Sequence, residues 1–255
     1  MIVETRAVVL KTIKYGDSSR IVTLYTKEYG KIKVVAKGAR NQKTSKFGSS
    51  LEPMSVSSVV LYKKEQRDLH LLSKSEVVMQ MTRLQDDPER MFAGLATVEL
   101  VNMVMHDEEG NAPVYDLLEQ TITLINGSER NSVNVFLSFM VKLFHRFGFG
   151  LAIGRCSGCG RDPEKEGFPY GLIRLSDGSL ICPHCAESSM QGGVRLSGGL
   201  LRSLLFLEAN PLERAAMLSL STAMRDELLA LLQSYLRYHI DGVRTLRSLA
   251  LLQSV

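Results

Sequence analysis

All four cysteines of the chain fall into two CxxC pairs, and none is left over. The pairs are Cys156-Ser-Gly-Cys159 and Cys182-Pro-His-Cys185, with 22 residues between them. A structural zinc ion needs four thiolate or imidazole ligands in a tetrahedron, and one CxxC turn presents two sulfurs from a single short loop. The pattern therefore predicts a four-cysteine zinc ribbon, with Cys156, Cys159, Cys182 and Cys185 holding one structural Zn²⁺ ion.

The segment between the pairs predicts a β-hairpin that returns the chain to the second pair. Residues 172–175 are strand-like, 176–179 are typical of a turn, and 180–181 resume a strand. Two disulfides, or one redox-active CxxC beside a coincidental pair, are the alternatives. The N-terminus lacks the apolar core of a signal peptide, so we expect a cytoplasmic, reducing compartment, which favours metal over disulfides. We expect His184, between two ligands, to be exposed and outside the ligand set.

Positive charge is concentrated near the N-terminus. Residues 1–80 hold 15 Lys and Arg against 7 Asp and Glu, whereas the whole chain holds 31 against 27. The remaining residues are therefore net negative. Such segregation is typical of a module that binds a polyanion, with a solvated basic surface as the alternative.

Residues 1–80 predict an all-β domain. Five short β-branched or alternating segments separated by turns are typical of a small closed barrel of the OB type. The segments are residues 5–13, 20–25, 31–36, 56–62 and 69–72. Residues 37–48 form a loop rich in cations, glycine and small polar residues, which suits contact with a phosphate chain.

The basic residues of this barrel are the candidate DNA-binding residues, and they would hold the backbone without reading sequence. They are Arg20, Lys31, Lys33, Lys37, Arg40, Lys43 and Lys46. Aromatic residues of the same region are candidate stacking platforms as a group, although each alone is more typical of barrel core or rim. They are Tyr15, Tyr25, Tyr29, Phe47 and Tyr62.

Residues 81–255 predict a helical domain with the zinc module, residues 156–185, inserted in it. Apolar residues at helical spacing predict helices over residues 88–107, 114–125, 131–148, 197–207 and 221–240, with another helical stretch opening at Pro211. Asp87, Ser197 and Ser221 are candidate N-caps. The predicted fold class is α+β: an N-terminal OB-fold β-barrel, then a helical domain with an embedded zinc ribbon.

The sequence carries no recognised catalytic motif. It lacks a Walker-type loop, a GxGxxG after a strand, HExxH and GxSxG, and its five histidines are scattered. No apolar run approaches the ~20 residues that span a bilayer. We therefore predict a binding protein that is not an enzyme and has no membrane partner.

Taken in order, several segments resemble the RecO family of bacterial recombination mediators over nearly the whole chain. In the barrel they are Val9-Leu10 to Gly16-Asp17, Arg20 with residues 22–30, residues 31–40, and Leu51-Glu52-Pro53. In the helical domain they are Phe144 to Gly148, Arg155-Cys156 to Cys159-Gly160, Tyr238-His239, and Leu246-Arg247-Ser248.

The resemblance implies a non-enzymatic mediator of recombinational repair. Such a protein binds single- and double-stranded DNA, anneals strands, and helps to load RecA onto DNA coated by the single-stranded-DNA-binding protein, SSB. The implied partners are DNA, RecR, the C-terminal tail of SSB, RecF and RecA, and the implied location is the nucleoid-associated cytoplasm. Two other hypotheses stay open from the residues alone. One is a zinc-ribbon factor or enzyme subunit that binds DNA sequence-specifically, and the other is a zinc-stabilised adaptor that binds an acidic protein tail.

Overall fold

A computed structural model describes residues 1–41, 46–64, 67–79, 81–188 and 193–252 of the chain. By its internal packing the chain forms two compact units, one of Met1–Gly127 with the segment from Leu246 onward, the other of Ser128–Thr245. The predicted division into functional domains at residues 80 and 81 stays a prediction. No helix in the described ranges combines the length and the apolar content that crossing a membrane requires.

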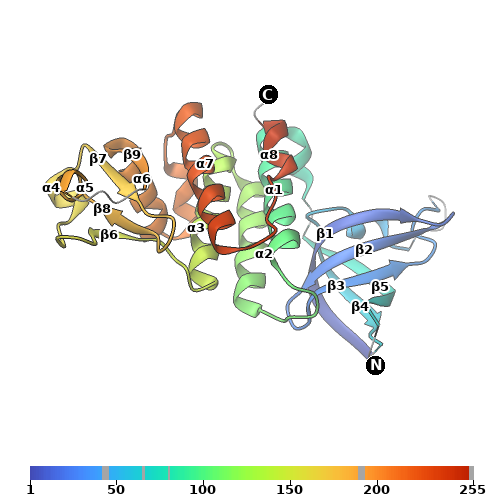
Figure 1. The fold of residues 1–255 in the computed structure, drawn as a ribbon. Helices are drawn as coiled ribbons and strands as arrows, with labels where there is room; N and C mark the ends of the chain where they lie inside the picture. Colours follow the sequence, from blue (N-terminus) through green and yellow to red (C-terminus); the bar gives the residue numbers. More distant parts are fainter. Residues whose placement is uncertain (42–45, 65–66, 80, 189–192, 253–255) are drawn as a thin grey trace. The chain divides into compact units, whose positions relative to one another are not determined.

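The first unit contains a closed five-stranded barrel (Figure 1). Its strands are β1 (Ile2–Tyr15), β2 (Ser19–Thr26), β3 (Gly30–Ala36), β4 (Val56–Tyr62) and β5 (Leu69–Met79), in the order β1-β2-β3-β5-β4. Strand β1 pairs with β4 along its first half and with β2 along its second half. A bulge between Val9 and Lys11 bends it, and parallel pairing of β3 with β5 closes the barrel. The predicted OB-type barrel is confirmed.

The barrel core follows from the alternation of side chains in β2 and β3. Ile32 and Val34 of β3 lie opposite Leu24 and Val22 of β2, and all four are buried. Because successive side chains of a strand point to opposite faces, Lys31 and Lys33 lie on the outer face. A short 3₁₀ turn, η1 (Gly48–Leu51), adds buried Leu51 to the same core.

Three α-helices belong to the first unit with the barrel: α1 (Pro88–Val104), α2 (Ala112–Gly127) and α8 (Arg247–Leu252). The 3₁₀ turn η2 (Thr82–Asp86) precedes α1. Asp87 caps α1 as predicted, since its side chain accepts a hydrogen bond from the Glu89 backbone N–H at 2.8 Å. The C-terminal helix α8 packs against α1.

The second unit combines helices with a small sheet. Its helices are α3 (Ser132–Arg146), α4 (Pro163–Glu166), α5 (Pro183–Ser188), α6 (Gly198–Ala209) and α7 (Thr222–His239), with the 3₁₀ helix η3 (Leu212–Met217) following Pro211. Ser197 and Ser221 cap α6 and α7 as predicted, each accepting a backbone hydrogen bond at 3.3 Å. The sheet has the order β6-β8-β7-β9, from β6 (Ala152–Cys156), β7 (Tyr170–Ile173), β8 (Ser179–Ile181) and β9 (Val194–Ser197). Antiparallel β7 and β8 confirm the predicted hairpin, whereas β6 and β9 extend it on both sides.

Candidate metal centre and candidate nucleic-acid interface

The four cysteines come together in the second unit. Cys156 ends β6, Cys182 follows β8, and Cys185 lies in α5. The Sγ atoms of Cys156, Cys159, Cys182 and Cys185 all lie within 4.8 Å of one another, and those of Cys159 and Cys182 are 3.6 Å apart. Zn–S bonds of about 2.3 Å in a tetrahedron place sulfurs about 3.8 Å apart, so the four thiolates fit a zinc ion.

The backbone around the cysteines is shaped for close packing of sulfur. A Cβ added at Gly158 would lie 3.0 Å from the Cys185 Sγ, so a larger residue at 158 would press on a ligand. The Gly160 N–H donates to the Cys156 carbonyl at 2.8 Å with Gly160 at a φ of +73°, which closes the first CxxC turn. The Cys182 N–H in turn donates to the Cys156 Sγ at 3.2 Å.

The surrounding backbone favours ionisation of the Cys156 thiol. Burial opposes its ionisation, but backbone N–H groups of Cys182, Cys159 and Gly158 outweigh burial and lower its pKa to about 6. Cys185 behaves in the opposite way, because hydrogen bonds with the Cys159 and Cys182 side chains raise its pKa to about 12. A bound dication would favour the thiolate at each position. His184 is exposed and is not among the four clustered ligands.

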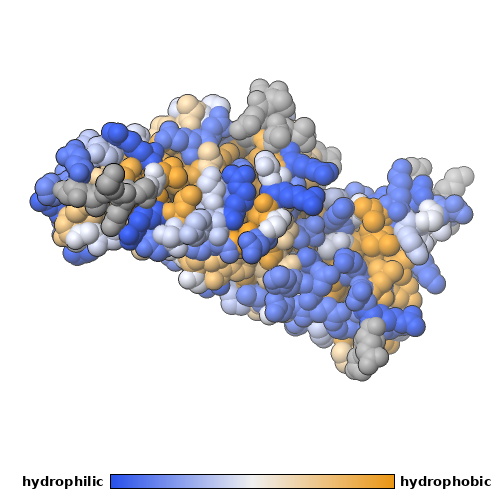
Figure 2. All heavy atoms as spheres, viewed as in Figure 1, coloured by the Kyte–Doolittle hydropathy of each residue, from blue (hydrophilic) through white to orange (hydrophobic). Residues whose placement is uncertain are grey.

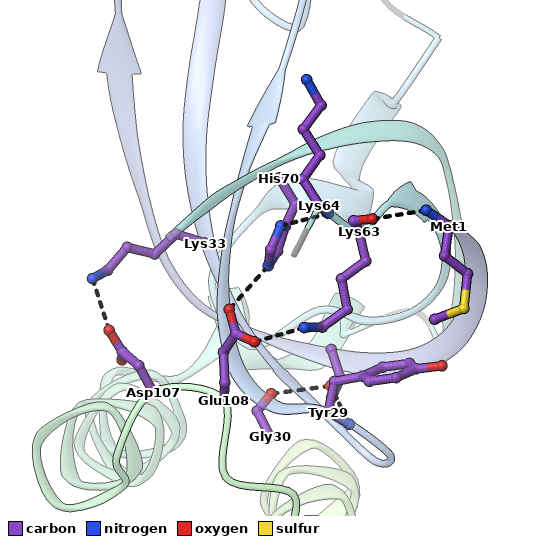
Figure 3. A network of polar contacts seen from close by, with 10 residues as sticks. Met1, Tyr29, Gly30, Lys33, Lys63, Lys64, His70, Asp107 and Glu108 are labelled. Atoms are coloured by element: carbon purple, nitrogen blue, oxygen red, sulfur yellow. Dashed lines mark hydrogen bonds and ion pairs between the residues drawn. The ribbon is translucent and has the colours of Figure 1, made fainter. Parts of the chain in front are cut away.

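Two of the predicted DNA-binding lysines form ion pairs with a carboxylate of the same unit. The Asp107 side chain, in the α1–α2 connector, lies 3.2 Å from Lys31 Nζ and 3.0 Å from Lys33 Nζ (Figure 3 shows the second contact). Lys31 also donates to the Asn102 carbonyl at 3.1 Å, and only 13% of its side chain is exposed. Burial opposes ionisation of Asp107, but hydrogen bonds from Lys33 and Lys31 prevail and lower its pKa.

The neighbouring Glu108 joins a second network in the barrel (Figure 3). Its carboxylate accepts from Lys63 Nζ at 2.6 Å and lies 3.3 Å from His70 Nε2. The hydrogen bond from Lys63 lowers the pKa of Glu108, although burial opposes it. His70 is fully buried and its Nδ1 accepts from the Lys64 N–H at 3.4 Å. Asp107 and Glu108 therefore fasten the α1–α2 connector onto the outer face of β3 and the loop before β5.

Two other predicted cations, Arg20 and Arg40, lie at the mouth of the barrel. They line a hollow of about 300 Å³ together with Thr12, Ile13, Lys14, Glu52 and Pro53. Arg20 Nη1 lies 2.7 Å from Glu52 Oε1, and Arg40 Nη1 donates to the Gly16 carbonyl at 2.8 Å. Thus the structure separates the predicted set: Lys31 and Lys33 share an internal acid, whereas Arg20 and Arg40 share a hollow.

The remaining predicted cations belong to the basic loop. Lys37 and Lys46 are exposed, and Lys46 Nζ lies 5.4 Å from the centre of the Phe47 ring. Lys43 lies outside the described residues. Among the candidate aromatics, Phe47 is buried in the barrel core, and Tyr25 is buried with its ring stacked on that of Tyr115 in α2. Tyr29 is half-buried against the core, while Tyr15 and Tyr62 are exposed. Figure 2 shows apolar surface on the barrel bordered by hydrophilic residues.

Sequence reasoning missed Lys14 at the mouth and Asp107 on the connector. Lys14 was visible as the last cation of the first strand, but only the register, which sets it directly opposite Arg20, shows that it belongs with Arg20. Asp107 is 74 residues from Lys33 in sequence, and no local pattern signals that pairing.

Known protein families and individual proteins are similar to this chain over nearly its whole length. Residues 1–81 match the family model "Recombination protein O N terminal", and residues 85–250 match "Recombination protein O C terminal". The chain is 32% identical over 251 residues to the DNA repair protein RecO of Chloroherpeton thalassium, an alignment that covers 97% of this chain and 96% of that protein. It is 34% identical over 254 residues to the DNA repair protein RecO of Salinibacter ruber, covering 100% and 94% of the two chains.

Proposed function

The chain belongs to the RecO family of DNA repair proteins, and on that premise we propose that it is a non-enzymatic recombination mediator. It binds single- and double-stranded DNA, anneals complementary strands and helps to load RecA onto SSB-coated DNA. RecR and the acidic C-terminal tail of SSB are its partners besides DNA, with RecF and RecA as further partners at the nucleoid.

The mouth of the barrel is the observation that most directly supports DNA binding. Three cations, Lys14, Arg20 and Arg40, surround one hollow that holds a single carboxylate, Glu52. Arginine and lysine donors of this kind hold phosphates without reading base sequence. A protein that anneals strands needs such sequence-tolerant contact, because the strands it pairs differ from one event to the next.

Lys31 and Lys33 are weaker candidates for the same role. Both already lie within 3.2 Å of Asp107, so a phosphate that binds them must compete with a carboxylate fixed to the same unit. Lys37 and Lys46 have no such constraint in the described part of the chain and remain candidates beside the mouth.

We further propose that the cysteine cluster holds one structural zinc ion. Four thiolates with no open position suit a structural ion and leave no site for a reacting water. When bound, the ion would cross-link the end of β6, the residue after β8 and α5, whereas the sheet itself joins only β6 to β8, with a shift in register between their two paired positions. Its expected contribution is therefore to the folding of the second unit.

The test is fluorescence-anisotropy titration of a labelled, mixed-sequence single strand over a salt series, using protein of measured zinc content. We expect tight binding, an affinity that falls steeply with salt, and about one zinc per chain. Annealing of complementary strands and RecA loading on SSB-coated DNA would then be measured with the same preparation. Absence of binding at low salt would overturn direct DNA handling and favour the adaptor, and strong sequence preference would favour the sequence-specific factor.

A further inference from the structure

The barrel mouth has the composition of a site for one phosphate group. On β1 and β2, Lys14 lies directly opposite Arg20, and Arg20 lies opposite buried Ala36 of β3. Directly opposed residues share one face of a sheet, so both cations stand at the end of the interior face. Like charges in this arrangement repel each other, and an anion between them removes the repulsion.

Arg40 adds a third cation from the loop after β3. Its backbone N–H donates to the Ser18 carbonyl at 2.9 Å, and its guanidinium donates to the Gly16 carbonyl at 2.8 Å. Both contacts tie Arg40 to the β1–β2 turn, which fixes it beside the hollow. A guanidinium has five N–H donors, so this one bond leaves others available to an anion.

Among the described residues that line the hollow, Glu52 is the one carboxylate. It lies 2.7 Å from Arg20, and 53% of its side chain is exposed. Exposed ion pairs of this kind are weak and are readily exchanged for another anion. Three cations against one carboxylate leave the hollow net positive with Glu52 in place.

We propose that this hollow is a phosphate subsite of the nucleic-acid strand, in which a phosphate displaces Glu52 and contacts Arg20, Arg40 and Lys14. The inference rests on the proposed DNA binding and assigns one contact within it. A volume of about 300 Å³ accommodates a phosphate together with its sugar, and Pro53 offers the sugar an apolar surface. Glu52 then pairs with Arg20 when no DNA is bound, and it lowers the affinity for DNA because the phosphate must displace it.

The decisive comparison is between Glu52→Gln and Glu76→Gln. Each removes one exposed carboxylate of a barrel ion pair, since Glu76 lies 2.7 Å from Lys74 and is 64% exposed. Both substitutions therefore change the net charge of the barrel by the same amount, whereas only Glu52 competes with a phosphate for the cations of the hollow. By anisotropy with a 3′-labelled single strand, we expect Glu52→Gln to bind roughly 3- to 10-fold more tightly and Glu76→Gln to change affinity less than about 2-fold.

Arg40→Ala tests the cationic side of the same subsite. We expect weaker binding and a salt slope smaller by about 0.7, the value of one phosphate contact to a single strand. The phosphate could be a terminal 5′-phosphate or a backbone phosphate. Strands with a 5′-phosphate or a 5′-hydroxyl, and a closed single-stranded circle, all labelled at the same internal base, separate these two sources. Preference for the 5′-phosphate with loss on the circle identifies a strand end, and equal binding of all three identifies the backbone.

The outcomes separate this inference from the proposed function. Salt-dependent binding by the wild-type protein, with Glu52→Gln indistinguishable from Glu76→Gln and no loss in Arg40→Ala, overturns the subsite and leaves DNA binding intact. No binding by the wild-type protein overturns both. Circular-dichroism melting of each variant verifies that the barrel is folded.

Discussion

His70 is a fully buried, titratable side chain between two polar partners. Its Nδ1 accepts from the Lys64 N–H and its Nε2 faces Glu108, an arrangement that suits the neutral imidazole. Burial lowers its pKa, while Glu108 opposes that shift. A proton added at Nδ1 would break the hydrogen bond from the Lys64 N–H. As the pH falls, protonation at His70 should therefore destabilise the barrel before its carboxylates begin to titrate.

We therefore expect a loss of stability that begins near pH 6.5. The unfolded chain takes up a proton on His70 that the native state resists, so the free energy of unfolding falls as the pH drops below the unfolded pKa, by at most about 1.4 kcal/mol per pH unit. Urea unfolding between pH 7.5 and 5.5 measures this slope, and His70→Gln should flatten it. An equal slope in the variant would show that protonated His70 is retained by Glu108.

Asp107 and Glu108 titrate in a separate window. Both have lowered pKa values, so the stability they contribute is present above their unfolded values and is lost as the pH falls through the folded ones, below about 4.5. His70→Gln should leave the Asp107 part of this lower phase unchanged and shift the Glu108 part only slightly, because Lys63 is the main cause that lowers the pKa of Glu108. Merging of the two phases in the wild-type protein would contradict the assignment.

At the scale of elements, the α1–α2 connector is held to the barrel by backbone as well as by charge. The Glu108 N–H donates to the Lys31 carbonyl at 2.8 Å, and Gly30 lies beneath the connector with φ +65°. A Cβ at Gly30 would lie 2.0 Å from the Glu109 carbonyl oxygen. Glycine at this turn is thus required both by its conformation and by the close approach of the connector.

Gly30→Ala should be much more destabilising than Gly38→Ala. Gly38 has a similar φ of +71° but no atom within 4 Å of an added Cβ, so it isolates the backbone strain, about 1–2 kcal/mol. We expect Gly30→Ala to cost about 1–3 kcal/mol more, because the connector must move. Denaturant unfolding of both variants measures this difference. Equal losses in the free energy of unfolding would mean that the connector moves away from the added Cβ without destabilising the fold.

The four-cysteine cluster, the proposed zinc site, also has a direct test. Cys159→Ser removes one of four ligands, so we expect zinc content well below one per chain and less stable packing of β6, β8 and α5. His184→Ala removes a nitrogen donor that stands between two of the ligand cysteines, and it should leave the metal content unchanged. Atomic absorption measures the zinc content of both variants. Metal loss in His184→Ala would place that histidine in the ligand set.

Local sequence signals predicted the elements but not their partners. β-Branched or alternating segments between turns marked β1–β4, Ser and Asp caps marked helix starts, and CxxC spacing marked the cysteine cluster. The start of β5 was predicted at Leu69, but it continues beyond Leu72 to Met79, because pairing with β4 sustains a segment whose own pattern is mixed. Lys14 opposes Arg20 because of the register of the β1–β2 hairpin, which residue types alone do not give. Lys33 and Asp107 are 74 residues apart, and no short window of sequence encodes their contact.

On the scale of the whole molecule, the chain passes from the first compact unit to the second at residue 128 and returns at residue 246. The returning segment is anchored in the first unit. The Glu99 carboxylate of α1 accepts from the backbone N–H groups of Arg247 and Ser248, each at 3.0 Å, and so caps α8. Leu246 and Leu249 are buried there. The C-terminal helix is therefore part of the fold of the barrel-containing unit.

We expect two thermal transitions by calorimetry that respond to different variants. Leu249→Ala leaves a cavity in the first unit, at a cost of about 2–5 kcal/mol, and should lower only the transition of that unit. Leu232→Ala in α7 is the matched truncation of a buried leucine in the second unit and should lower only the other, as should chelation of zinc. DNA added to the wild-type protein should raise the first transition, because the barrel mouth lies in that unit. One merged transition that shifts alike in every case would mean that the two units unfold as a single cooperative body.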